Sequence, residues 1–254
     1  MDLSSYLTFA ADLAYRAGRL TLGHFNVGVR PDYKPDDTPV TAADRAAEEF
    51  IRGEIGKAYP GHSLLGEEFG RDERESTHRW IIDPIDGTKS FMRGVPLYGV
   101  LIGLEVEGTV RVGAAYYPGT DEMLCAAEGL GAWWNGRRAR VSELGLDRGV
   151  VCFTTYGNFE KYGRLGAWER LNKAAYMLRG WSDAYGYLLV ATGRAEAMLD
   201  PVMAAWDCGP FPVILKEAGG YFGSWDGREG HTYGEGLACS AIVKDEVLAL
   251  ISGD

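Results

Sequence analysis

The chain has 254 residues, enough for one large domain or two small ones, and its 46% hydrophobic and 24% charged residues exclude a disordered, collagen-like or coiled-coil protein. Acidic residues outnumber basic ones by 36 to 26, which argues against a general nucleic-acid-binding protein. An acidic protein can still act on a phosphorylated small molecule if metal cations lie between its carboxylates and the anion.

Helical periodicity dominates the N-terminal part of the chain. Apolar residues recur at three- and four-residue steps over Leu3–Phe25, which predicts a helix with one apolar face. A short strand or loop over Val27–Tyr33 separates it from a second predicted helix over Thr41–Lys57, in which Thr41 is the expected N-cap. We expect the two helices to pack together.

Strand patterns follow from Ser63 onward. Glycine and proline residues separate apolar segments in a way typical of an antiparallel meander. The predicted strands are Leu64–Leu65, Trp80–Ile82, Tyr98–Val106, Val110–Tyr117 and Met123–Ala127. A hairpin is predicted over Gly129–Arg140, with Asn135 and Gly136 as its turn.

Strands and helices alternate in the rest of the chain. The predicted strands are Val150–Thr154, Ala197–Asp200 and Leu237–Ile242, a loop covers Pro201–Ala205, and the predicted helices are Leu165–Tyr176, Ala184–Thr192, Pro210–Ala218 and Asp245–Ile251. Helices, then a meander, then alternating units predict a layered α/β fold. We expect two subdomains, over residues 1–145 and 146–254.

The cysteine pattern bears on the compartment. Cys125, Cys152, Cys208 and Cys239 are far apart and form no CxxC pair, which is typical of reduced thiols in a cytoplasmic protein rather than of disulfides or a zinc site. The sequence shows neither a signal-peptide pattern nor an apolar run long enough to span a membrane. We therefore expect a soluble cytoplasmic protein without a membrane partner.

Three acidic segments each stand where a predicted strand ends: Gly66-Glu67-Glu68, Asp83-Pro84-Ile85-Asp86-Gly87-Thr88 and Trp206-Asp207. Carboxylates held on rigid strand ends suit a hard cation. Pro84 restricts the backbone between the two aspartates, and Gly87 permits a tight turn whose amides can face an anion. Each segment alone also has an ordinary interpretation, as a turn, a solvated acidic pair or a helix cap. Together they favour a site for metal ions and a phosphate.

The order of these motifs resembles the inositol monophosphatase family of metal-dependent phosphomonoesterases. The resemblance rests on GEE at 66–68, WIIDPIDGTKSF at 80–91, WD at 206–207 and PFPVILKEAGG at 210–220, and it extends from Leu3 to Ile251. It implies an alternating αβαβα sandwich of the inositol monophosphatase and fructose bisphosphatase type. It also implies two or three Mg²⁺ ions, replaceable by Mn²⁺, inhibition by lithium in many members, and a homodimer.

The resemblance further implies a role for each matching residue. The metal ligands would be the side chains of Glu67, Asp83, Asp86 and Asp207 and the backbone carbonyl of Ile85. The catalytic group would comprise Glu67 together with Thr88 and Asp44, the last two by orienting and deprotonating the metal-bound water. The amides of Gly87 and Thr88 would hold the substrate phosphate. Lys34 falls on a loop that lies near the metals in the family, and an ordinary exposed loop lysine is the alternative interpretation.

The second subdomain would select the ester. Asp-x-Tyr-Gly-Tyr at 183–187 resembles the histidinol-phosphatase branch, and Trp181-Ser182-Asp183 replaces the Gly-Thr/Ser-Ala run typical of inositol-specific members. A carboxylate there would attract the ammonium and imidazole groups of histidinol phosphate. The predicted substrate contacts are Asp86, Gly87, Thr88, Arg179, Asp183, Asp200 and Asp207. For Asp183 a helix N-cap, and for Arg179 a surface or dimer contact, remain open as alternatives.

These observations predict a Mg²⁺-dependent phosphatase that hydrolyses L-histidinol phosphate in histidine biosynthesis by means of a metal-activated water. An inositol-1-phosphate or broad-specificity phosphatase is the alternative. A catalytically silent regulatory protein of the same fold is a third possibility, but a binding module has no need for the complete set of acidic residues together with Thr88. The expected partner is a small phosphorylated metabolite.

Overall fold

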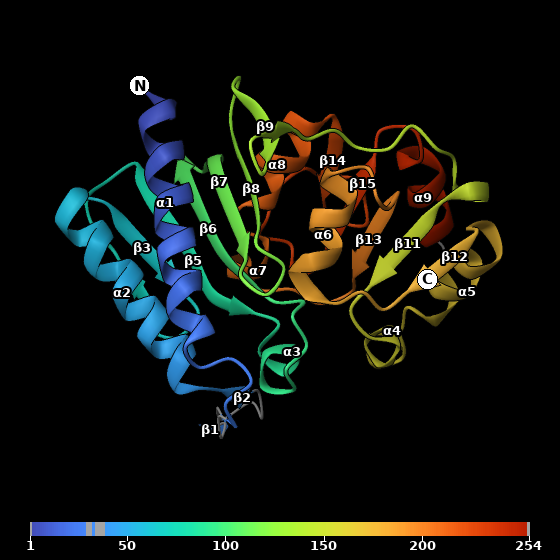
Figure 1. Ribbon diagram of the computed structural model, residues 1–254. Coiled ribbons are helices and arrows are strands. Elements are labelled where there is room, and N and C mark those ends of the chain that lie inside the picture. Colours follow the sequence, from blue (N-terminus) through green and yellow to red (C-terminus); the bar gives the residue numbers. More distant parts are fainter. Residues whose placement is uncertain (1, 29–31, 34–38, 253–254) are drawn as a thin grey trace.

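The computed structural model describes residues 2–28, 32–33 and 39–252, so Lys34 lies outside the described residues. Two β-sheets alternate with three layers of helices (Figure 1). Helices α1 (Leu3–Leu22) and α2 (Ala42–Ala58) cover the outer face of the first sheet. Helices α6 (Asp183–Ala191), α7 (Ala205–Cys208) and α8 (Phe211–Ala218) lie between the sheets, and α4 (Tyr156–Lys161), α5 (Leu165–Ala174) and α9 (Lys244–Ile251) lie beyond the second sheet (Figure 1). The predicted αβαβα layering is confirmed.

The N-terminal helices follow the predicted pattern closely. The apolar face of α1, with Leu13 and Ala17, is buried against the first sheet. Helix α2 begins with a capping box, in which Thr41 Oγ1 accepts from the amide of Ala43 at 3.1 Å and Asp44 Oδ2 accepts from the amide of Thr41 at 2.8 Å. The capping box satisfies amides that have no partner within the helix.

The first sheet has eight strands in the order β10-β9-β8-β7-β6-β5-β3-β4. Their bounds are β3 Ser63–Gly66, β4 Gly70–Asp72, β5 His78–Asp86, β6 Gly99–Val106, β7 Thr109–Tyr117, β8 Glu122–Ala127, β9 Gly131–Trp134 and β10 Arg137–Arg138. The prediction of a purely antiparallel meander is wrong in one place, because β3 pairs with β5 in parallel. The chain first turns back through the short, polar strand β4 on the far side of β3, and only then returns to form β5.

The second sheet has five strands in the order β12-β11-β13-β15-β14, and β11 is parallel to both of its neighbours. The bounds are β11 Val150–Phe153, β12 Met177–Arg179, β13 Ala197–Asp200, β14 Gly220–Gly223 and β15 Gly236–Ser240. Outside it lie α4 (Tyr156–Lys161), α5 (Leu165–Ala174) and α9 (Lys244–Ile251). A separate two-stranded sheet joins β1 (Asp32–Tyr33) to β2 (Pro39–Val40).

The middle layer shares one hydrophobic core with both sheets. It contains α6 (Asp183–Ala191), α7 (Ala205–Cys208) and α8 (Phe211–Ala218). Tyr187 of α6 stacks on Phe211 of α8 with ring centroids 4.7 Å apart, and their core cluster includes Tyr117 of the first sheet and Phe222 of the second. The division into subdomains at residue 145 stays a prediction. None of the described helices is both long and apolar enough to cross a membrane.

Candidate metal centre and adjoining pocket

Three carboxylates from two elements meet where β5 ends near α7. Asp83 lies near the end of β5, Asp86 is the last residue of β5, and Asp207 belongs to α7. One oxygen from each of these side chains lies within 4.8 Å of the others. Asp83 is 1% exposed and Asp86 is 9% exposed. Converging, largely buried carboxylate oxygens are the donor set that a hard divalent cation prefers.

An irregularity in β5 allows two aspartates three residues apart to serve one site. In a regular strand, residues at odd spacing point to opposite faces of the sheet. Between Asp83, which pairs with Leu101, and Asp86, which pairs with Gly99, β5 has one residue more than β6. This β-bulge, which contains Pro84, turns both carboxylates to the same side. The amide of Ile85 donates to Asp83 Oδ1 at 3.0 Å and fixes that side chain.

The position of Asp207 corrects the prediction that all three acidic segments end strands. Asp207 lies within the one-turn helix α7, and its Oδ2 accepts from the amide of Ala204 at 2.8 Å. It therefore caps its own helix rather than the helix that follows. Gly103 of β6 leaves room for this arrangement, because a Cβ there would overlap the carbonyl of Gly209, directly after α7.

Burial and mutual repulsion raise the free energy of the ionised carboxylate cluster when no cation compensates its charge. Burial, followed by the charge of Glu67, raises the pKa of Asp83 well above its ordinary range. Burial, followed by the charge of Asp183, does the same for the pKa of Asp86. Burial raises the pKa of Asp207 to about 6. A divalent cation among these groups would favour their ionised forms.

Thr88 and Asp44 meet although they are far apart in the sequence. Thr88 is the first residue of α3 (Thr88–Met92), which follows Gly87 in a left-handed conformation with φ of 89°. The hydroxyl of Thr88 lies 3.2 Å from Asp44 Oδ1 and 3.1 Å from the carbonyl oxygen of Ile85. The other oxygen of Asp44 accepts from Thr41. Burial raises the pKa of Asp44.

A pocket of about 360 Å³ adjoins the carboxylate cluster. Four of the predicted site residues line it, namely Asp86, Asp183, Asp200 and Asp207. Asp200 Oδ2 accepts from the hydroxyl of Tyr187 at 2.8 Å, and burial raises the pKa of Asp200 to about 7. Asp183 Oδ2 accepts from the hydroxyls of Ser90 and Ser182. The pocket is therefore acidic on several sides.

A model of the inositol monophosphatase family matches residues 2–251. This chain belongs to the inositol monophosphatase family. It is 42% identical over 252 residues to a histidinol-phosphatase of Chlorobaculum parvum, which covers 98% of this chain and 97% of that protein. It is 34% identical to an inositol-1-monophosphatase of Mesorhizobium japonicum, over 90% of this chain and 89% of the relative.

The fold agrees with solved structures of the same family. The IMPase of Thermotoga maritima superimposes with a TM-score of 0.89 and 30% identity, over 98% of this chain and 97% of that one. The chain is thus a phosphomonoester hydrolase of the inositol monophosphatase family. The metal dependence of that family fits the cluster of Asp83, Asp86 and Asp207.

Among the predicted substrate contacts of this inositol monophosphatase homologue, Arg179 does not reach the pocket. Arg179 is exposed at the end of β12, its guanidinium donates to the carbonyl of the neighbouring Leu178 at 2.9 Å, and it is not among the described residues that line the pocket. Asp183 is the first residue of α6 with φ of 41°, and Ser182 occupies the N-cap position, so the N-cap interpretation of Asp183 is wrong.

Sequence reasoning missed part of the pocket wall. Ser182 and Tyr187 line the pocket and belong to the segment that was expected to select the ester. No site role was predicted for the other lining residues, which are Lys89, Ser90, Thr154, Thr155, Asn158, Val202 and Met203. The two threonines stand at the end of the predicted strand over 150–154, and polar residues at such an end are a usable signal. Asn158 lies on α4, which was not predicted, and so had no structural context in the sequence.

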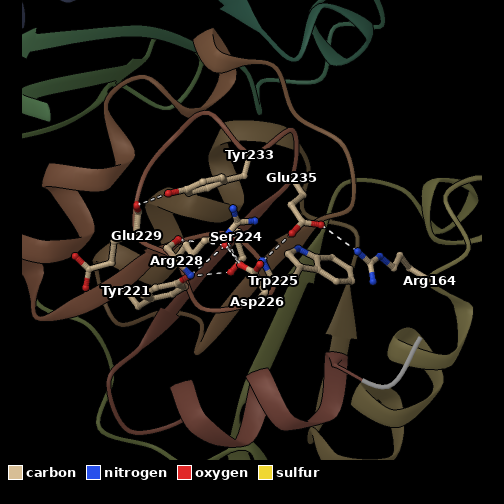
Figure 2. Close-up of polar contacts among 9 residues, drawn as sticks. All are labelled: Arg164, Tyr221, Ser224, Trp225, Asp226, Arg228, Glu229, Tyr233 and Glu235. Carbon is tan, nitrogen blue, oxygen red and sulfur yellow. Dashed lines mark hydrogen bonds and ion pairs between the residues drawn. The ribbon is translucent and has the colours of Figure 1, made fainter. Parts of the chain in front are cut away.

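The connection between β14 and β15 contacts this wall at Met203. The amide of Met203 donates to the carbonyl of Gly234 at 2.9 Å. Figure 2 shows the next residue, Glu235, between Arg164 and Trp225: its carboxylate accepts from the guanidinium at 3.2 Å and from the amide of Trp225 at 2.9 Å. Arg164 lies between α4 and α5, so this ion pair joins the segment that follows α4, the helix of Asn158, to the connection that contacts Met203.

Proposed function

We propose that this phosphatase hydrolyses L-histidinol phosphate with the help of Mg²⁺. The observation that carries the proposal is the acidic pocket, in which Asp183 and Asp200 adjoin the carboxylate cluster. The histidinol ester carries an ammonium group and an imidazole, which carboxylates attract, whereas inositol offers only hydroxyls. The 42% identity to a histidinol-phosphatase, against 34% to an inositol-1-monophosphatase, supports the same choice.

The metal ligands that we assign are the carboxylates of Glu67, Asp83, Asp86 and Asp207 and the carbonyl of Ile85. The carbonyl oxygen of Ile85 has two lone pairs, and the hydroxyl of Thr88 uses at most one of them. All of these donors are oxygens, which suits Mg²⁺ and equally Mn²⁺. Bound divalent ions supply an activated water as the nucleophile and neutralise charge on the phosphate and the leaving oxygen.

Thr88 and Asp44 then act as a proton relay. When the hydroxyl of Thr88 donates to Asp44 Oδ1, the lone pairs of Thr88 Oγ1 are directed away from Asp44 and can accept from the attacking water. Burial raises the pKa of Asp44, which makes this carboxylate a better proton acceptor than an exposed one. The amides of Gly87 and Thr88 would hold the phosphate beside this pair. No covalent intermediate is required.

The decisive measurement is phosphate release in the presence of Mg²⁺ from L-histidinol phosphate, inositol 1-phosphate and adenosine 3',5'-bisphosphate. We expect the highest kcat/KM for histidinol phosphate. We also expect a loss of at least about 100-fold in Asp86→Asn, because even the outer partners of metal ligands cost up to that factor when changed. A clear preference for inositol 1-phosphate would overturn the histidinol assignment.

A charge-only variant tests the acidic pocket itself. Asp183→Asn keeps an oxygen that accepts from Ser90 and Ser182 but removes the charge. We expect kcat/KM for histidinol phosphate to fall about tenfold, the size of a lost charge-assisted hydrogen bond, with little change for an aryl phosphate that has no cationic group. An equal loss for both esters would show that Asp183 has only a structural role.

We also infer a homodimer and a cytoplasmic location. The dimer rests on the family resemblance, and light scattering of the purified protein measures it directly. The location is supported by the cysteines, all four of which are free in the structure, as expected of a protein from a reducing compartment.

A further inference from the structure

Glu48 is a buried charge in the middle of α2. Its side chain is 0% exposed, and both of its carboxylate oxygens have partners. Oε1 accepts from Nε of Arg52 at 2.7 Å and from the amide of Phe69 at 3.3 Å, and Oε2 accepts from the amide of Glu68 at 2.7 Å. A buried carboxylate is tolerated only with such compensation. Two of its three partners are backbone amides of a single turn.

This turn joins β3 to β4 and carries Glu67. The amide of Glu67 itself donates to the carbonyl of Ile82 at 3.3 Å, one residue before Asp83. On the other side of the turn, Arg52 donates to the carbonyl of Gly70. The turn is therefore attached to β5 at its first residue and to α2 at the following ones.

Gly66 completes the arrangement. A Cβ at this position would overlap the carboxylate of Glu48. The carboxylate can reach the turn only because residue 66 has no side chain. The glycine of the Gly66-Glu67-Glu68 segment thus makes room for the buried group that holds the rest of that segment.

We propose that Glu48 is a positioning residue for the metal centre: it holds the β3–β4 turn so that the carboxylate of Glu67 faces Asp83. The proposal rests on the proposed function, because it takes Glu67 as a metal ligand. Strand β4 has only three residues and lies at the sheet edge, so its ladder alone holds the turn weakly. Hydrogen bonds from amides to a charged acceptor are about twice as strong as neutral ones.

The pairing with Arg52 has a second effect. Glu48 would otherwise add an uncompensated negative charge beside the turn that carries Glu67, whose own charge already raises the pKa of Asp83. The guanidinium of Arg52, 2.7 Å from Glu48 Oε1, compensates that charge within the same cluster of contacts.

The chain offers a matched control. Glu217 of α8 accepts from the amides of Gly129 and Gly131 at 2.8 and 2.7 Å, in the turn between β8 and β9. Like Glu48 it binds two backbone amides of one turn, although it is only partly buried, and its turn contributes no residue to the carboxylate cluster or to the residues that line the pocket. Glu217→Gln therefore reports the general cost of weakening such contacts.

The experiment measures binding of Mg²⁺ alone by calorimetry, with the full-length protein and no substrate. In Glu48→Gln the NH₂ group of the side chain replaces one of the two carboxylate oxygens. It then faces a backbone N–H of the turn, and because two donors cannot bond to each other, one of the two hydrogen bonds to the turn is lost. We expect the Kd for Mg²⁺ to rise about tenfold, as for other outer partners of metal ligands, and to change less than about twofold in Glu217→Gln. In a Glu67→Gln background, Glu48→Gln should cause no further loss.

Each remaining outcome has one interpretation. If Glu67→Gln weakens Mg²⁺ binding but Glu48→Gln does not, or if Glu217→Gln weakens it equally, the positioning proposal is overturned and the ligand assignment stands. If Glu67→Gln itself binds Mg²⁺ like the wild type, both fail. Thermal unfolding without Mg²⁺ shows that each variant is folded.

Discussion

Asp200 is a pocket carboxylate for which burial disfavours the negative charge that would attract a cationic substrate. It lines the pocket, where a negative charge would attract a cationic substrate, yet it is 5% exposed and accepts from Tyr187. Burial raises its pKa to about 7 from an ordinary value of 3.8. Near neutral pH this carboxyl group is therefore close to the point at which it gains or loses its proton.

This shift makes stability depend on pH with a definite sign. Between pH values of about 4 and about 7 the folded protein holds a proton on Asp200 that the unfolded chain has lost, so its contribution to stability falls as pH rises through that window. Asp200→Asn cannot titrate and keeps an acceptor for Tyr187. We expect the Tm measured without metal to fall less between pH 5 and pH 8 in Asp200→Asn than in the wild type. Parallel curves for both proteins would contradict the prediction.

At the scale of elements, two glycines in the first sheet set the position of α7. A Cβ on Gly103 would overlap the carbonyl of Gly209, and one on Gly113 would overlap the carbonyl of Pro210. The sheet therefore approaches the backbone after α7 more closely than any other residue type would allow. Asp207 depends on this close contact for its place beside β5.

Gly103→Ala tests the contact. We expect a loss of about 1–3 kcal/mol in the free energy of unfolding, because an added methyl group has no space, together with weaker Mg²⁺ binding as α7 shifts. Chemical denaturation and calorimetry measure the two effects. Gly53→Ala is the control: Gly53 lies within α2 with nothing near its Cβ position, and alanine there should stabilise by about 0.5–1 kcal/mol. A neutral Gly103→Ala would show that the sheet and α7 can separate without cost.

The elements also show what local sequence can predict. Periodicity and capping located α1 and α2 within a few residues, and Asn135-Gly136 marked the β9–β10 turn. The strands β4, β12 and β14 have three or four residues with little alternation, and α3 and α4 have five and six residues, so no pattern is long enough to identify them. The parallel pairing of β3 with β5 depends on where β4 turns back, which is a tertiary choice.

The same limit applies to the site. The sequence motif indicates that Asp83 and Asp86 belong to one site. A regular strand would place their side chains on opposite faces, and only the bulge in β5 brings them together. The role of Glu48 cannot be predicted from the sequence, because a glutamate within an amphipathic helix ordinarily faces solvent, whereas Glu48 is buried. Its two amide partners on the turn, Glu68 and Phe69, lie 20 and 21 residues further along the chain, and nothing in the local pattern connects them to Glu48.

For the whole molecule, the net charge of −10 has a local component at the cluster of Asp83, Asp86 and Asp207, which repel one another in the folded state and far less in the unfolded one. Mg²⁺ should therefore stabilise the fold as a whole. The cluster joins the first sheet to the middle layer of helices, so an ion bound there holds two layers together.

We expect Mg²⁺ at about a hundred times its Kd to stabilise the protein by about 2.7 kcal/mol, and chelation to reverse this. Asp86→Asn should show a smaller Mg²⁺-induced rise in Tm, yet a Tm without Mg²⁺ at or above that of the wild type, because one repelling charge is gone and Asn still accepts from the amide of Ala184. NaCl at equal ionic strength separates specific binding from screening. A lower Tm for the metal-free variant would contradict the repulsion argument.

Because the core is shared by both sheets, it cannot be completed until most of the chain has been synthesised. The first sheet is complete at Arg138, but α6 and α8, which cover its inner face with the rest of the middle layer, begin only at Asp183 and Phe211. While the ribosome adds those residues, the apolar side chains of that face, among them Leu101 and Tyr117, stay exposed to solvent. During that time the nascent chain exposes the kind of apolar surface through which partly folded chains aggregate.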